Sequence, residues 1–112
     1  MPIFKQGHVV RVPFPYTDRN TRQHRPALVV SDGPVGEGDA FLWVAMITSA
    51  ENRAWPGDHV IEAFAQAGLP IPSVVRPTKI TTVEARDAEP VGQLDDVLVA
   101  KVMTTIAGLL RR

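Results

Sequence analysis

Apolar residues along this chain come in short runs that prolines and glycines separate. Six of these runs are rich in Val, Ile and Phe, which favour strands over helices. They cover residues 8–14, 27–31, 41–48, 58–62, 73–76 and 79–83. Turn-forming residues lie between several runs, notably at positions 31–34 and 55–57. The pattern therefore predicts six short strands.

The last segment of the chain has a different period. Its apolar residues recur at spacings of three and four, which is typical of an amphipathic helix. These residues are Leu98, Val99, Val102, Met103, Ile106 and Leu110. Asp95 or Asp96 lies where a helix N-cap belongs, and two arginines follow where cations complement the helix dipole. We predict a C-terminal helix, and we leave open whether residues 62–68 form a short helical turn.

Short strands at close spacing and one helix predict a small, strongly bent sheet or barrel with the helix packed on one opening. A chain of 112 residues, 45% of them hydrophobic, can bury one modest core. We therefore expect a single domain over residues 1–112. The absence of cysteine excludes a disulfide framework and a cysteine nucleophile. No signal peptide or membrane-spanning run is visible, so we expect a cytoplasmic protein without a membrane anchor.

The balance of charge directs attention to one segment. Twelve Lys and Arg match twelve Asp and Glu, so an RNA-binding site would have to come from local clustering. Residues 18–25 form such a cluster, which holds Arg19, Arg22, His24 and Arg25. Guanidinium groups at this density suit phosphate binding. By composition alone, a solvated hairpin loop is the simpler interpretation.

Three blocks of sequence, spread over most of the chain, together form one pattern. The first block, residues 7–31, holds Pro-Phe-x-x-Thr-Asp, the basic segment and Arg-Pro-Ala-Leu-Val-Val-Ser. The second block is Val-Ala-Met-Ile-Thr-Ser at 44–49, and the third covers residues 69–82. These blocks and their order resemble the MazF/PemK family of toxins from type II toxin–antitoxin systems. The phrase Pro-Ser-Val-Val-Arg at 72–76 is similar to the PemK-like branch.

The resemblance implies a fold, an activity and partners. The fold would be mainly β with a C-terminal α-helix, a small SH3-like barrel of the CcdB/MazF/PemK kind. The activity would be sequence-specific cleavage of single-stranded RNA, with messenger RNA as the expected substrate, by a homodimer that a cognate antitoxin protein inhibits. The family's catalytic positions fall on Arg25 and Thr48, and an arginine that some members use falls on Arg76. Those members have an acidic residue where this chain has Thr78, so the role of a carboxylate stays open.

The chemistry of these side chains can be considered independently of the resemblance. Attack by the 2′-hydroxyl of RNA requires a base, stabilisation of charge on the phosphate, and a proton for the leaving 5′-oxygen. Arg25 suits the second task, because a guanidinium donates to two oxygens but holds its own protons too tightly to act as a base. Thr48 can bind a phosphate oxygen or orient the hydroxyl. His24 is the candidate base, although neighbours on a regular strand point to opposite faces.

Other residues are candidates for contacts with RNA. Arg19 and Arg22 belong to the basic segment, Lys79 lies in the third block, and Trp55 lies in a turn where it could stack on a base. Trp43 lies in an apolar run, so we expect it in the core. Acidic residues and histidines show no metal-ligand spacing. We therefore expect a reaction without metal or other cofactor, which leaves a 2′,3′-cyclic phosphate.

Two other functions are compatible with such a fold. One is a toxin that inhibits a protein such as DNA gyrase without cutting RNA, and the other is a non-catalytic RNA-binding barrel. Arg25, Thr48 and Arg76 together favour the nuclease, since a pure binder needs no phosphate-directed trio. If the chain is such a toxin, we expect an acidic, partly disordered antitoxin segment to cover the basic segment and block RNA.

Overall fold

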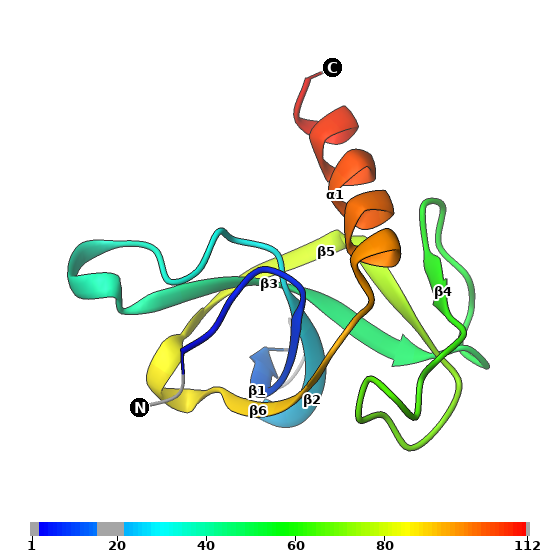
Figure 1. Cartoon of the computed structure of the whole chain (residues 1–112), viewed down its shortest axis with the longest axis horizontal. Helices are drawn as coiled ribbons and strands as arrows, with labels where there is room; N and C mark the ends of the chain where they lie inside the picture. The colour runs from blue at the N-terminus through cyan, green and yellow to red at the C-terminus, as the bar shows by residue number, and fades with distance from the viewer. Residues whose placement is uncertain (1–2, 16–21, 112) are drawn as a thin grey trace.

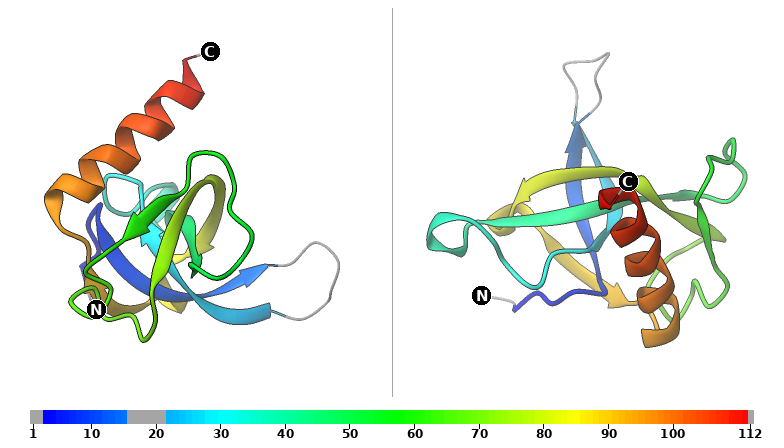
Figure 2. Two further views of the ribbon diagram at one scale, coloured as in Figure 1. Left: turned by 90° about the vertical axis from the view of Figure 1, so that its right-hand side faces the viewer. Right: turned by 90° about the horizontal axis from the view of Figure 1, so that it is seen from above.

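The computed structural model of this chain describes residues 3–15 and 22–111 (Figure 1). Within these residues, six strands form one antiparallel sheet in the order β4-β5-β3-β2-β1-β6. The strands are β1 His8–Pro15, β2 Arg22–Val29, β3 Phe41–Ser49, β4 His59–Ile61, β5 Ser73–Glu84 and β6 Glu89–Gln93. The helix α1, Asp96–Leu110, follows, and two 3-10 turns, η1 Glu37–Asp39 and η2 Ala85–Asp87, flank β3 and β5. The sheet curls strongly and α1 lies beside its opening, which confirms the predicted barrel with a C-terminal helix (Figure 2).

The two runs expected as strands 73–76 and 79–83 belong to one strand, β5, so the predicted break between them is wrong. The pairing of β5 with β3 shifts between Ala45 and Met46, whose partners are Ile80 and Arg76. Pro77 lies within this bulge, where the ladder does not require its missing N–H. The proline therefore bends the strand instead of ending it.

The strand β6 was not predicted, because Pro90 and Gly92 are unfavourable inside a strand. It lies at the edge of the sheet and pairs only with β1, through His8 with Gln93 and Val10 with Pro90. An edge strand tolerates a proline whose absent donor faces away from the ladder. The predicted number of strands is therefore right, but two predicted strands form one and β6 was missed. In addition, β2 begins five residues before the predicted strand 27–31 and ends at Val29.

The helix begins as predicted. Of the two candidate caps, Asp95 is the N-cap, and its Oδ1 accepts a hydrogen bond from the backbone N of Leu98 at 2.9 Å. Residues 62–68 form hydrogen-bonded turns and not a helix, with Leu69 N donating to Phe64 O at 2.9 Å. None of the described helices is long and apolar enough to cross a membrane.

Buried side chains pack on both faces of the curled sheet, because successive strand residues point to opposite sides. The cluster under α1 includes Leu28, Ile47 and Val75 of the sheet with Val102 and Ile106 of the helix. The cluster on the other face includes Val10, Val12, Ala27, Val29, Leu42 and Val44. This alternation fixes which face each polar residue of β2 and β3 occupies.

Trp43 departs from the expectation that it belongs to the core, since 52% of it is exposed. It lines a groove of about 490 Å³ between β3, β5 and the last turns of α1. Ile80, Met103 and Leu110 line the same groove. The apolar run of β3 therefore extends past the part of the sheet that the helix covers.

Candidate functional site

A cavity of about 340 Å³ lies where the pairing of β2 with β3 ends. The last paired residues are Ala27 and Met46. Pro26, which precedes Ala27 in β2, has no backbone N–H with which to continue the pairing. The cavity is lined by Arg11, His24, Arg25, Ile47, Thr48 and Ser49 of the sheet and by residues 68–71 of the loop before β5. The three sequence blocks that carry the family resemblance therefore meet at one place.

The sheet register places Arg25 and Thr48 on the same face. Ala27 pairs with Met46, and Val29 pairs with Val44. Continuing this register by two residues brings Arg25 opposite Thr48, with both side chains on the face that carries Ala27. Arg25 is half-buried and Thr48 is only 5% exposed. The structure thus brings both expected catalytic residues to one cavity.

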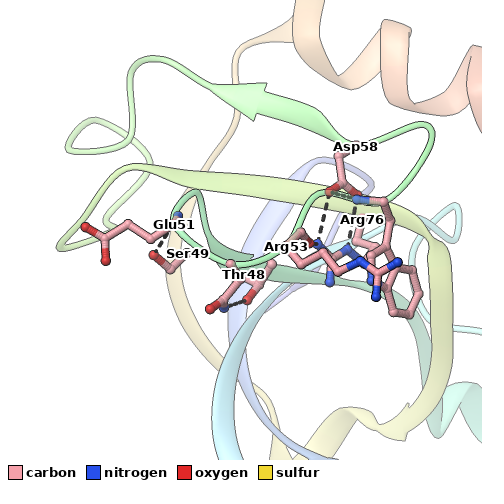
Figure 3. Close-up of polar contacts among 8 residues, drawn as sticks. Thr48, Ser49, Glu51, Arg53, Asp58 and Arg76 are labelled. Atoms are coloured by element: carbon pink, nitrogen blue, oxygen red, sulfur yellow. Dashed lines mark hydrogen bonds and ion pairs between the residues drawn. The ribbon is translucent and has the colours of Figure 1, made fainter.

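Asn52 is a further polar residue at Thr48, which the sequence analysis did not identify. Its side-chain Nδ2 donates a hydrogen bond to the Thr48 hydroxyl oxygen at 2.7 Å (Figure 3 shows Thr48). The backbone N of Asn52 donates to the carbonyl of Ser49 at 3.1 Å, so a tight turn after β3 returns the side chain to Thr48. No motif marks Asn52, and only this turn identifies it.

His24 lies beside Arg25 on a regular part of β2, not in an irregular loop. His24 pairs with Pro13 and Arg25 pairs with Val12. Strand alternation directs the two side chains to opposite faces of β2, although both residues line the cavity. His24 is exposed. Its role as the base stays a prediction.

Arg76 lies outside the residues that line the cavity. Its side chain is buried, and Nε and Nη2 donate to both carboxylate oxygens of Asp58 at 3.1 and 3.0 Å (Figure 3). Nη2 also donates to the carbonyl of Arg53 at 2.8 Å. The guanidinium lies over the ring of Trp55 at 4.4 Å from its centroid. Arg76 therefore fastens the segment between β3 and β4 onto β5.

The four residues expected to contact RNA are distributed differently. The Nζ of Lys79 lies 5.8 Å from the ring centroid of Trp55, and 39% of Trp55 is exposed. These two residues thus form one group with Arg76. Arg22 begins β2, and Arg19 lies outside the described residues. No group of three or more His, Asp or Glu within residues 3–15 and 22–111 is placed to hold a metal ion.

The pKa of the Asp58 carboxyl group is shifted by its surroundings. Burial alone would raise its pKa, but hydrogen bonds from the Arg76 side chain and the Trp55 backbone N–H, with the positive charge of Arg76, outweigh burial. The pKa of Asp58 therefore lies below its ordinary value. The ion pair stabilises the fold fully above the ordinary carboxyl pKa of about 3.9. This stabilisation is lost as the pH falls through the lowered pKa.

We expect Asp58→Asn to lower the free energy of unfolding at pH 7 by about 3 kcal/mol, because it leaves a buried guanidinium without its counter-charge. Urea denaturation measures this loss. The difference from the parent should shrink as the pH falls below about 4 and through the lowered pKa of Asp58, where the parent carboxylate becomes protonated. Glu84→Gln is the matched control, since it removes an exposed pair with Arg86 and should cost under about 1 kcal/mol. Equal losses in the two variants would contradict the prediction.

The fold and the cavity define a small, curled antiparallel barrel in which Arg25 and Thr48 lie just beyond the point where the pairing of β2 with β3 ends. The chain matches the profile of the family described as "PemK-like, MazF-like toxin of type II toxin-antitoxin system" over residues 5–110. No curated protein matches the chain significantly by sequence. The chain belongs to this PemK-like, MazF-like family of type II toxins.

Solved structures agree with this fold. A MazF from Deinococcus radiodurans superposes with a TM-score of 0.76 at 21% identity, covering 100% of both chains. A chain of a MazE-MazF structure from the same organism gives 0.75 at 21% identity, covering 99% of this chain and 98% of that one. A mycobacterial endoribonuclease in complex with its cognate antitoxin gives 0.71 at 19% identity, covering 98% and 95%. At these identities the similarity shows the shared fold.

Proposed function

We propose that the protein is a sequence-specific endoribonuclease toxin that cleaves single-stranded RNA at the cavity bounded by Arg25 and Thr48. The observation that carries the proposal is the shared location of these two residues. One continued register puts them on the same face, and both line the same cavity. A guanidinium and a hydroxyl at one concave site suit recognition of a phosphate oxygen. The mycobacterial relative of the same fold is itself an endoribonuclease.

In the proposed reaction the 2′-hydroxyl of RNA attacks the adjacent phosphorus. The 2′-oxygen–phosphorus bond forms while the phosphorus–5′-oxygen bond breaks, which yields a 2′,3′-cyclic phosphate and a free 5′-hydroxyl. Arg25 stabilises the charge on the phosphoryl oxygens, and Thr48 donates to one of them. His24, at the cavity wall, accepts the proton of the 2′-hydroxyl. The leaving 5′-oxygen takes one proton from the solvent, and His24 afterwards releases its proton to the solvent, so that no net proton is gained or lost.

Contacts beyond the cavity would hold the rest of the RNA. The basic segment at residues 18–25, which includes Arg19 and Arg22, supplies positive charge close in the sequence to Arg25 of the cavity. Trp55 offers an exposed ring with the ammonium group of Lys79 near it, which suits a stacked base and its phosphate. We assign Arg76 to support of this surface, because its side chain is buried and its Nε and Nη2 donors bind Asp58 and Arg53.

The experiment that tests the function is incubation of the purified protein with a long single-stranded RNA in the presence of EDTA. We expect fragments whose ends map to one short sequence motif. Retention of RNA without cleavage would instead indicate a non-catalytic RNA-binding barrel. Intact RNA that is not retained would favour a toxin with a protein target, which inhibition of DNA gyrase can then test.

We also propose that the protein is a homodimer, joined through the apolar groove between α1 and the sheet. Trp43, Ile80 and Leu110 line this groove and are 52%, 43% and 80% exposed. Such a patch is larger than isolated exposed side chains and suits a two-fold interface. Trp43→Glu should give a monomer by light scattering at micromolar concentration, where the parent is a dimer. Lys101→Glu, on an exposed part of α1 outside the groove, is the control. A monomeric parent would contradict the proposal.

The remaining partner is a cognate antitoxin. Two of the similar structures hold an antitoxin, one as a MazE-MazF structure and one as an endoribonuclease complex. We propose that an acidic segment of the antitoxin covers the basic segment at Arg19, Arg22 and Arg25, and so excludes RNA by imitating its phosphates. Copurification of the protein encoded by the adjoining reading frame, and suppression of toxicity by it, test this proposal.

A further inference from the structure

The hydroxyl of Thr48 is held by the side chain of Asn52, which lies outside the three sequence blocks that resemble the family. Its oxygen accepts a hydrogen bond from Asn52 Nδ2 at 2.7 Å, and Thr48 is only 5% exposed. A hydroxyl group has one hydrogen and two acceptor lone pairs. Because the carboxamide nitrogen can only donate, it occupies a lone pair and directs the Thr48 hydrogen away from Asn52. The hydrogen is then available to an acceptor that enters the cavity.

Asn52 is itself held from two sides. On one side its backbone N donates to Ser49 O at 3.1 Å, and Ala50 N donates to Pro72 O at 3.0 Å. On the other side the carbonyl of Arg53, the next residue, accepts from Arg76 Nη2 at 2.8 Å. Arg76 in turn forms an ion pair with the buried carboxylate of Asp58 (Figure 3). The turn that carries Asn52 is therefore tied to both β3 and β5.

We propose that Asn52 is a positioning residue of the RNA-cleaving site, which sets the direction of the Thr48 hydroxyl, and that the Arg76–Asp58 pair keeps Asn52 in place. This inference rests on the proposed function. It gives buried Arg76 a supporting role in cleavage without contact with the RNA. It also predicts that Asn52 affects the chemical step more than the binding of RNA, since Asn52 acts through Thr48 and makes no contact with the RNA itself.

The first test compares Asn52→Ala and Asn52→Asp with the parent protein. We expect kcat for cleavage of a defined RNA to fall about tenfold to a hundredfold, because a small misplacement of a reacting group has effects of this size. The dissociation constant for the same RNA carrying a 2′-deoxy group at the cut site should change less than about twofold, because Asn52 does not itself contact the RNA. Asn52→Asp keeps the shape but replaces the donor by an acceptor, so it should lose at least as much activity as Asn52→Ala. Glu51→Ala, at the neighbouring exposed position, is the control.

The second test introduces Asn52→Ala into Thr48→Ala, with single-turnover rates measured under enzyme excess. If Asn52 acts through Thr48, the second substitution causes no further loss. Parent rates for Asn52→Ala, weakened RNA binding at an unchanged kcat, or losses that add in the double variant would each overturn the inference. Melting temperatures close to that of the parent exclude simple unfolding, and Asn52→Asp, which keeps the volume, serves where Asn52→Ala unfolds.

The outcomes separate this inference from the function on which it rests. A parent protein that leaves RNA intact would overturn the proposed function, and the role of Asn52 with it. If the parent cleaves RNA and Arg25→Ala does not, while Asn52→Ala keeps the parent rate, only the role of Asn52 is overturned.

Discussion

Arg25→Ala is expected to cleave single-stranded RNA about a hundred to a thousand times more slowly than the parent protein, because it removes a positioned donor of positive charge. Arg25 is half-buried at the cavity wall, on the face of the sheet that it shares with Thr48. We expect a guanidinium at this position to stabilise the charge that develops on the phosphoryl oxygens during cleavage. Single-turnover rates at saturating enzyme measure the chemical step directly.

Arg11→Ala is the matched control for this prediction. Arg11 also lines the cavity and carries the same charge, but it is exposed and lies one residue before Val12, which pairs with Arg25. Strand alternation directs Arg11 to the opposite face from Val12. We expect Arg11→Ala to weaken RNA binding modestly. This weakening should be smaller at low salt. Equal activity of Arg25→Ala and the parent would remove the central assignment of the site.

Much of the fold could be predicted from the sequence, because its elements depend on local patterns. The helical period predicted α1 with Asp95 or Asp96 as its cap, and β-branched runs predicted β1, β3 and β4 close to their observed bounds and part of β2. The errors arose where long-range pairing decides the structure. Pro77 is accommodated by a bulge between β5 and β3, and β6 is stabilised as an edge partner of β1 in spite of Pro90. Neither pairing leaves a mark in the local sequence.

The candidate site divides in the same way. Arg25 and Thr48 follow from the family resemblance, and the register then brings them to one cavity. Asn52 could not be predicted, since it reaches Thr48 only through the turn that follows β3. Arg76 could be matched to an arginine that some family members use. Its burial could not be predicted, because its partner Asp58 is 18 positions away in a loop. Here the sequence motifs identified the candidate catalytic residues Arg25 and Thr48, but not the side chain of Asn52 that holds the Thr48 hydroxyl.

The prediction with the largest expected effect concerns the nucleophile. An RNA with a single 2′-deoxy nucleotide at the cut site should be bound but left intact, even in the presence of a large excess of the protein. The cavity offers a guanidinium, a hydroxyl and an imidazole, which are groups that bind phosphate and move protons. Such groups suit attack by the 2′-hydroxyl, which is intramolecular and avoids the entropic cost of capturing a separate nucleophile.

The measurement uses one synthetic RNA that contains a single cleavage motif, labelled at its 5′ end and incubated in EDTA. The unmodified RNA should yield a 5′ fragment ending in a 2′,3′-cyclic phosphate, which mass spectrometry distinguishes from a linear phosphate by the mass of one water molecule. The control RNA carries its 2′-deoxy group one nucleotide away from the cut site and should be cleaved nearly normally. Because only the nucleotide that supplies the attacking oxygen is essential, cleavage of the 2′-deoxy RNA at an undiminished rate would show that water attacks the phosphate instead. The roles given to Arg25 and Thr48 in charge stabilisation would survive that result, whereas proton removal from the 2′-hydroxyl by His24 would not.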